Sequence, residues 1–140
     1  MIVNWKMYDG FDANGKFWTD SNSLMMMERE LNTRKEYQMK DHSSNISSNY
    51  YPVTSAIAMR DDNGTNRQVT IMTERPQGGS VDLSKGSIEL MQSRRLTEDD
   101  NKGVIEPLNE TDSNGQGLQV NAKYFMQIFD YKKAVSKQRE

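Results

Sequence analysis

The sequence predicts an all-β fold, an antiparallel β-sandwich, on the strength of three observations. Apolar and polar residues alternate in several short runs, which is the period of a strand with one buried face. Clusters of Gly, Asn and Asp separate these runs and favour the turns that join antiparallel strands. The 140 residues have the length of one domain, with room for roughly five to eight strands.

The N-terminal part of the chain contains three candidate strands. Residues 1–8 alternate with the period of a strand, and residues 16–19 form a short run after a turn signal. Residues 24–31 include three consecutive methionines and suit a helix by propensity. The residues after them are polar on every face, however, so we expect a strand there. The face of the first strand expected to point inward holds Val3, Trp5 and Met7.

The most regular alternation covers residues 50–60, which predict one continuous strand. An Asp-Asn-Gly turn at residues 61–64 and a second alternating run at residues 68–73 predict a β-hairpin. Residues 76–79, Pro-Gln-Gly-Gly, predict a second tight connection. The inward face of the first run holds Tyr51, Val53, Ser55, Ile57 and Met59.

Residues 86–111 join a strand-like run to a charged loop that is rich in turn residues. Two arginines, Arg94 and Arg95, are followed within five residues by Asp99 and Asp100. A strand that ends in such a loop is a common way for a β-scaffold to present polar groups to a site.

Residues 117–130 alternate throughout and predict a long final strand. Phe125 and Phe129 interrupt its polar face, which suggests contact with another layer. The charged tail from Lys132 is compatible with the start of a helix. The inward face of the strand holds Leu118, Val120, Ala122, Tyr124, Met126 and Ile128.

The composition predicts a thin hydrophobic core. Hydrophobic residues make up 34% of the chain and charged residues 27%. Ordinary globular chains are roughly 45–50% apolar when glycine is counted. Two explanations remain open: a sandwich with much exposed surface, or a piece of a larger protein whose other parts cover it.

Charge and cysteine content exclude several classes of function. The net charge is -2 and the two signs are interspersed, so no basic surface for nucleic acid is expected. The chain has no cysteine, which removes disulfides and thiolate chemistry. No apolar run reaches about 18 residues, so we expect no membrane-spanning helix. The first residues lack the order of a signal peptide, so we expect any targeting segment upstream.

The candidate catalytic residues have simpler explanations. His42, the only histidine, lies in a serine-rich loop, where a solvated imidazole is expected. With one histidine and no cysteine, a tetrahedral zinc site in this chain would have to use carboxylates almost alone, which is unusual. Asp99 and Asp100 could form a glycosidase pair, but adjacent loop residues usually point apart, so we expect solvated loop carboxylates. No catalytic residue and no metal ligand is therefore assigned to this chain.

Arginines and aromatic residues are the candidate binding groups. Arg94 and Arg95 on a strand would point to opposite faces, so at most one of them would reach a given site, and a salt bridge to a nearby carboxylate is the alternative. Trp18 or Tyr50 could stack on a sugar, whereas we expect Tyr51 in the core.

Three sequons predict N-glycosylation. Asn45, Asn63 and Asn109 each begin an Asn-X-Ser or Asn-X-Thr triplet, which fits a protein of the secretory pathway.

Several stretches, in the same order along the chain, are similar to the C-terminal β-region of α-mannosidases of glycoside hydrolase family 38, the lysosomal type in particular. They read FWTDSNS, NYYPVTSAIAMRD, ERPQGGSVDLSKGSIELM, RRLTEDDNKGVIEPLNE and GLQVNAKYFMQIFD. The chain departs from the family at Ser23, where a glycine is usual, and at Glu74 and Pro76, where an aspartate and a serine are usual.

The resemblance implies that residues 1–140 are part of the C-terminal β-sandwich domain, a portion of a galactose mutarotase-like supersandwich and an incomplete domain. It also implies a zinc-dependent retaining parent enzyme that removes terminal α-linked mannose from glycans in the lysosome or secretory pathway. The family's zinc ligands and nucleophile come from an N-terminal catalytic domain and a helical bundle, the expected partners of this piece. One arginine of the pair Arg94 and Arg95 would border the substrate pocket, and the isolated piece would be inactive. The alternative is an independent β-sandwich module that binds carbohydrate or protein without catalysis.

Overall fold

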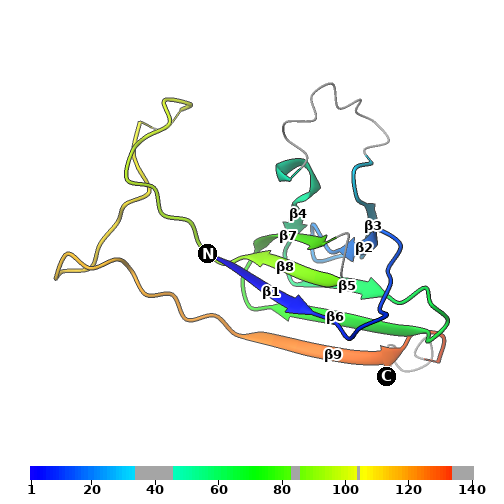
Figure 1. Cartoon of the computed structure of the whole chain (residues 1–140). Coiled ribbons are helices and arrows are strands. Elements are labelled where there is room, and N and C mark those ends of the chain that lie inside the picture. Colours follow the sequence, from blue (N-terminus) through cyan, green and yellow to red (C-terminus); the bar gives the residue numbers. More distant parts are fainter. Residues whose placement is uncertain (34–45, 83–85, 104, 134–140) are drawn as a thin grey trace.

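The computed structural model describes residues 1–33, 46–82, 86–103 and 105–133, which form two antiparallel sheets facing each other (Figure 1). The four-stranded sheet has the order β1 (Ile2–Lys6), β8 (Ser87–Met91), β7 (Gln77–Asp82) and β4 (Tyr51–Val53). The five-stranded sheet has the order β3 (Met27–Glu30), β2 (Lys16–Thr19), β5 (Ala56–Arg60), β6 (Arg67–Thr73) and β9 (Tyr124–Asp130). A single turn of 3-10 helix, Ser47–Asn49, precedes β4. The predicted antiparallel β-sandwich is confirmed.

The core lies between the two sheets and is built from alternate residues of the strands. Phe17 on β2 packs edge-on against Tyr51 on β4, and their ring centroids are 5.6 Å apart. Trp5 on β1 makes a similar contact of 4.8 Å with Tyr124 on β9. The buried cluster comprises Phe11, Ala13, Phe17, Leu31, Val53, Ile57, Met59, Val69, Ile71, Val81, Ile88 and Leu90.

Several predicted elements are confirmed. The alternating runs at the N-terminus and after Gly86 form β1, β2 and β8. Residues 27–30 form β3, so strand rather than helix is correct there. The hairpin around the Asp-Asn-Gly turn is β5 paired with β6, and Ile57 lies opposite Ile71.

The predicted continuous strand over residues 50–60 is wrong, because the chain breaks at Thr54 and Ser55. The part before the break is β4 of one sheet, and the part after it is β5 of the other. Asp20, only 4% exposed, holds this corner. Its Oδ1 accepts hydrogen bonds from the backbone N–H groups of Thr54 at 3.0 Å and Ser55 at 3.1 Å. Its Oδ2 accepts one from the Ser55 hydroxyl.

The predicted tight connection at residues 76–79 is also wrong, since Gln77, Gly78 and Gly79 begin β7. Tyr51 of β4 lies opposite Gly79 in the sheet. A Cβ on Gly79 would lie 2.5 Å from Cγ2 of Val53 and 3.0 Å from Cδ1 of Ile57. The glycine is therefore needed for close packing between the sheets rather than for a turn.

The chain between β8 and β9, residues 92–123, forms an arm that runs out from the sandwich and returns to it (Figure 1). Leu96 N–H donates to the Leu108 carbonyl at 3.0 Å, and Thr111 bridges to Gly117. At the returning end, Arg75 donates to the Asn121 carbonyl at 2.8 Å. Glu74 accepts from the Lys123 N–H at 3.1 Å, so one of the two unusual residues before β7 fastens the arm.

The predicted strand over residues 117–130 is correct only for its second half, β9. Residues 118–123 are not paired, and Leu118 is 60% exposed. Most of the face expected to point inward is also exposed on β9, where Met126 and Ile128 are open to solvent. Within the described ranges, no helix is long and apolar enough to cross a membrane.

Candidate functional site

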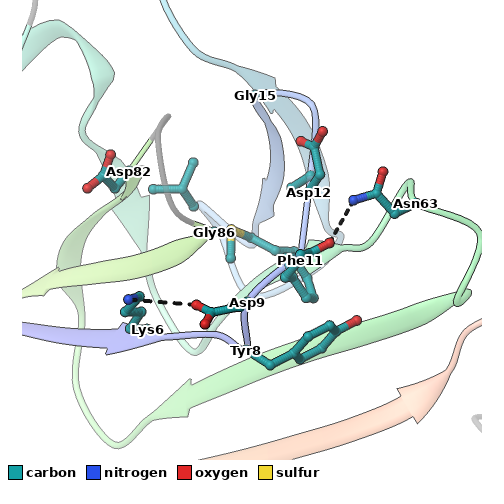
Figure 2. Close-up of a pocket in the computed structure, with 13 residues that line it drawn as sticks. Lys6, Tyr8, Asp9, Phe11, Asp12, Gly15, Asn63, Asp82 and Gly86 are labelled. Atoms are coloured by element: carbon teal, nitrogen blue, oxygen red, sulfur yellow. Dashed lines mark hydrogen bonds and ion pairs between the residues drawn. The ribbon is translucent and has the colours of Figure 1, made fainter.

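A cleft of about 480 Å³ opens where the chain leaves β1 and turns into β2 (Figure 2). Tyr8, Phe11 and Asp12 come from this connection, Asn63 comes from the β5–β6 turn, and Asp82 comes from the end of β7. Segments far apart in the sequence thus meet around one opening. The full lining is Lys6, Tyr8, Asp9, Gly10, Phe11, Asp12, Ala13, Gly15, Met59, Asn63, Val81, Asp82 and Gly86.

Asp61, which is 1% exposed, joins two walls of the cleft beneath its surface. Its carboxylate accepts hydrogen bonds from the hydroxyls of Tyr8 and Thr65, both at 2.5 Å. It also accepts from the backbone N–H groups of Asp12 at 3.2 Å and Asn63 at 3.0 Å. Burial by itself raises the pKa of Asp61, but these hydrogen bonds outweigh it and lower the pKa to about 2. The carboxylate is therefore a permanently charged anchor at neutral pH.

The polar groups on the cleft surface mainly contact one another. Lys6 lies 4.0 Å from Asp9, and Asp12 accepts the Asn14 N–H at 2.7 Å as in an Asx turn. The Asn63 side-chain amide donates to the Gly10 carbonyl at 2.6 Å, a bond drawn in Figure 2. Asp9, Asp12 and Asp82 give the cleft acceptors for the hydroxyl groups of a polar ligand.

Gly86 closes one side of the cleft by close approach to the β1–β2 connection. Its φ is +55°, and a Cβ there would lie 2.9 Å from the Phe11 carbonyl oxygen. Met7 N–H donates to the Gly86 carbonyl at 3.1 Å. Only a residue without a side chain fits at this contact.

The arginine pair predicted as a pocket border lies outside β8, in the exposed first part of the arm. The premise that both arginines sit on a strand is therefore wrong. Arg94 lines a groove of about 310 Å³ with Leu96 and Leu108. Arg95 points elsewhere: its Nη1 is 2.9 Å from where a Cβ of Gly117 would be. In the described part of the chain, neither arginine lies within ion-pair distance of a carboxylate, so the predicted salt bridge is not formed.

The aspartate pair of the same groove shapes its turn. Asp99 accepts the Asn101 N–H at 2.9 Å, and Asp100 accepts the Lys102 N–H at 3.0 Å. Each carboxylate thus bonds the backbone two residues ahead, which is the ordinary role of aspartate in a turn. Both aspartates therefore lie in a loop, as expected, and each stabilises its turn.

The two aromatic residues that could stack on a sugar, Trp18 and Tyr50, both contact other side chains of the protein. The Arg60 guanidinium lies over the ring of Trp18, 4.4 Å from its centroid. The Tyr50 hydroxyl donates to Glu89 at 2.9 Å. Burial and this hydrogen bond, with the charge of Glu89, raise the pKa of Tyr50 to about 12. Tyr51 is only half buried, although it packs against the core as expected.

The remaining predicted positions are divided between the surface and the undescribed segments. Asn63 and Asn109 are exposed. Asn45 and His42 lie outside the described residues. Among the residues that are described, no three His, Cys, Asp or Glu side chains are grouped to hold a metal ion. With no cysteine and a single histidine in the whole chain, this donor set does not fit a zinc site.

The sequence pattern predicts a turn at Asp61 and Asn63 and a glycan on Asn63, but it does not predict the cleft. The signal was the repetition of Asp, Asn and Gly at residues 12–15 and 61–64. Each cluster predicts its own turn, but their contact joins positions 49 residues apart in the bond from Asp12 N–H to Asp61. A local pattern carries no information on that pairing.

Comparison with known proteins gives a consistent family. The model of the glycosyl hydrolases family 38 C-terminal domain matches residues 5–102. Lysosomal alpha-mannosidase of Bos taurus is 40% identical over 127 residues, which cover 91% of this chain and 12% of the relative. The Homo sapiens protein of that name is 40% identical over 115 residues, covering 82% of this chain and 11% of the relative. Alpha-mannosidase of Canavalia ensiformis is 28% identical over 128 residues, covering 88% and 12%. The chain thus spans about an eighth of the length of these relatives.

Proposed function

This chain belongs to the C-terminal domain family of the family 38 glycosyl hydrolases, and from that membership we propose that residues 1–140 are one part of the C-terminal β-sandwich domain of an α-mannosidase. The parent enzyme hydrolyses terminal α-linked mannose of glycans with retention of configuration, through a covalent glycosyl-enzyme. The residues described here do not fit its zinc ion. The family resemblance implies that the zinc ligands and the nucleophile belong to the N-terminal catalytic domain and the helical bundle, and we propose that this piece supplies scaffold.

Exposed apolar side chains on the arm carry the proposal. Ile105 is 82% exposed and Leu118 is 60% exposed, although both sit on a segment held in place by hydrogen bonds. A surface on which several large apolar residues gather is often covered by other protein, and these residues of one segment support such a contact. We infer that the arm lies against the catalytic domain of the parent enzyme, where the family resemblance implies that Arg94 or Arg95 borders the active-site cleft. Arg94 already lines a groove of the arm.

The proposal predicts that the purified chain does not hydrolyse an aryl α-mannoside in the presence of zinc. Among the residues that the structure describes, no three His, Cys, Asp or Glu side chains are grouped to hold a metal ion, and positioned groups with a metal account for much of such an enzyme's rate. Full-length bovine lysosomal alpha-mannosidase, assayed in parallel, is the positive control. Turnover by the chain above the buffer blank would overturn the proposal.

A binding module is the competing function, and the acid-lined cleft is the observation in its favour. Isothermal titration of the chain with mannose oligosaccharides separates the two. We expect no saturable heat, because Arg60 covers Trp18 and Glu89 binds the Tyr50 hydroxyl. Saturable binding that is lost in Trp18→Ala or Tyr50→Ala, or in Asp12→Asn in the cleft, would favour the module.

The lysosomal relatives support a parent that passes through the secretory pathway. Asn45, Asn63 and Asn109 are then glycan acceptors. Expression behind a signal peptide in mammalian cells, followed by glycosidase treatment and peptide mass spectrometry, tests this. Asn63→Gln and Asn109→Gln should each remove one glycan, since both side chains are exposed.

A further inference from the structure

The face of β9 that should be buried lies open along one side of the sandwich. Ile128 is paired with Val69 of β6, and Met126 is paired with Ile71, so each pair shares the inner face of the sheet. Val69 is 2% exposed and Ile71 is fully buried, whereas Ile128 is 60% exposed and Met126 is 51% exposed. The inner face is therefore covered over β6 and uncovered one strand further on.

The position of β1 explains where the cover ends. Trp5 lies on Tyr124, the first residue of β9. Three residues later, Tyr8 lies beside Arg67 of β6, 5.7 Å from its guanidinium. β1 thus crosses the five-stranded sheet from β9 towards β6 and leaves the later part of β9 bare. β1 is also the outermost strand of its own sheet.

The outer edge of β1, next to this bare face, offers backbone groups that pair with no other described strand. Met1 accepts a hydrogen bond from Gln92, and Met7 donates one to Gly86. Hydrogen-bonded pairs recur at every second residue of an antiparallel ladder. With Val3 opposite Leu90, the odd-numbered residues of β1 therefore bond to β8, and the N–H and C=O groups of the even-numbered ones point away. The groups at this free edge belong to Ile2, Asn4 and Lys6.

We propose that β1 and the inner face of β9 form a docking site for one additional β-strand of the same α-mannosidase polypeptide. The inference depends on the function proposed above. The strand adds to the free edge of β1 and places an apolar side chain at every second position over Met126 and Ile128. The bovine relative has about seven-eighths of its length outside the matched segment, which is ample chain to supply this strand.

A chimera tests the proposal: this chain replaces the matching 127-residue segment of bovine lysosomal alpha-mannosidase. Hydrogen exchange resolved to single amides is then read along β1. We expect the amides of Ile2, Asn4 and Lys6 to exchange as slowly as those of Val3 and Trp5, because both edges of β1 are then paired. In the chain on its own, the even-numbered amides should exchange much faster than the odd-numbered ones.

Substitution tests the apolar half of the site. Ile128→Lys should lower the yield of active chimera by about tenfold or more, because the lysine charge would be buried under the added strand. Gln127→Lys, at an exposed neighbouring position on the opposite face, is the matched control and should change the yield less than about twofold. In the isolated chain, Ile128→Lys should leave the urea midpoint unchanged, since the position is already exposed there.

The outcomes distinguish the two proposals. An active chimera with fast-exchanging even-numbered amides, or with no effect of Ile128→Lys, overturns the docking strand and leaves the proposed function standing. An inactive wild-type chimera overturns both. Sedimentation of the isolated chain adds one further outcome. A dimer that Ile128→Lys dissociates would make a second copy the occupant and overturn the proposal.

Discussion

Asp61 illustrates at the scale of single residues how one buried carboxylate organises two loops. It receives hydrogen bonds from four groups, of which Tyr8 and Asp12 belong to the β1–β2 connection and Asn63 and Thr65 to the β5–β6 turn. Asp61→Asn should lower the free energy of unfolding at pH 7 by roughly 1–3 kcal/mol, because charge-assisted bonds are replaced by weaker ones. Urea titration measures the change. Asp62→Asn, at an exposed neighbour, should have almost no effect.

The lowered pKa of Asp61 predicts a dependence of stability on pH. The folded-state pKa is about 2 and the unfolded value is 3.8, so the unfolded chain binds more protons between them. The stabilisation is complete above about pH 4–5 and is lost as the pH falls through about 2. The difference between the two pKa values corresponds to roughly 2 kcal/mol of folding free energy. The stability difference between wild type and Asp61→Asn should therefore shrink from pH 5 to pH 2, and a constant difference would contradict this origin.

Ser23 has a backbone conformation that a glycine would adopt at less cost. Its φ is +59°, in the left-handed region, within a turn where Asn22 accepts the Leu24 N–H at 3.0 Å. Ser23, where the family resemblance implies a glycine, thus holds a conformation that costs a residue with a side chain more than it costs glycine. Ser23→Gly should raise the free energy of unfolding by roughly 0.5–1 kcal/mol. Ser113→Gly, at an exposed turn position without a positive φ, should instead lower it slightly, and equal effects would refute the argument.

At the scale of elements, β7 depends on the absence of a side chain at Gly79. The nearest atoms to an added Cβ belong to Val53, Ile57 and Leu90, which are fully buried. Gly79→Ala should lower the free energy of unfolding by about 1–3 kcal/mol through overpacking, which thermal unfolding would measure. Gly103→Ala meets no atom within 4 Å and has no positive φ, so its melting temperature should match wild type or exceed it slightly. A neutral Gly79→Ala would show that the sheets can move apart without cost.

The strands that the sequence predicted correctly are those whose pattern is set locally. The β5–β6 hairpin needs only two alternating runs and the turn after Arg60. The break between β4 and β5 could not be predicted, because it depends on Asp20, 34 residues away from Thr54. The turn predicted at residues 76–79 is wrong for a related reason. A glycine such as Gly79 indicates a turn unless the side chains that pack against it are known. Leu118 to Ala122 alternate as a strand would, yet no strand among the described residues pairs with them.

At the scale of the whole molecule, apolar side chains are buried between the sheets but exposed along the arm and β9. Val69 and Ile71 are buried, but the arm and β9 expose large apolar residues. This explains the thin core that the composition predicted, and it favours the explanation of a piece covered by other protein. The candidate site was predictable only in part. The sequence predicts Arg94 and Arg95 as candidates. It does not predict that Arg94 lines a groove while Arg95 lies beside Gly117, because both contacts depend on how the arm folds back.

The corner held by Asp20 also has a mechanical consequence. β4 and β5 belong to opposite layers and are joined by only two residues, so any sliding of one layer over the other stretches the chain at Thr54 and Ser55. The hydrogen bonds from the Thr54 and Ser55 N–H groups to the Asp20 carboxylate would then be stretched before the hydrogen bonds between the strands of either sheet. In an optical trap pulling between Val53 and Ile57, Asp20→Asn should lower the rupture force, because a neutral amide accepts weaker hydrogen bonds from the two backbone N–H groups than a carboxylate does.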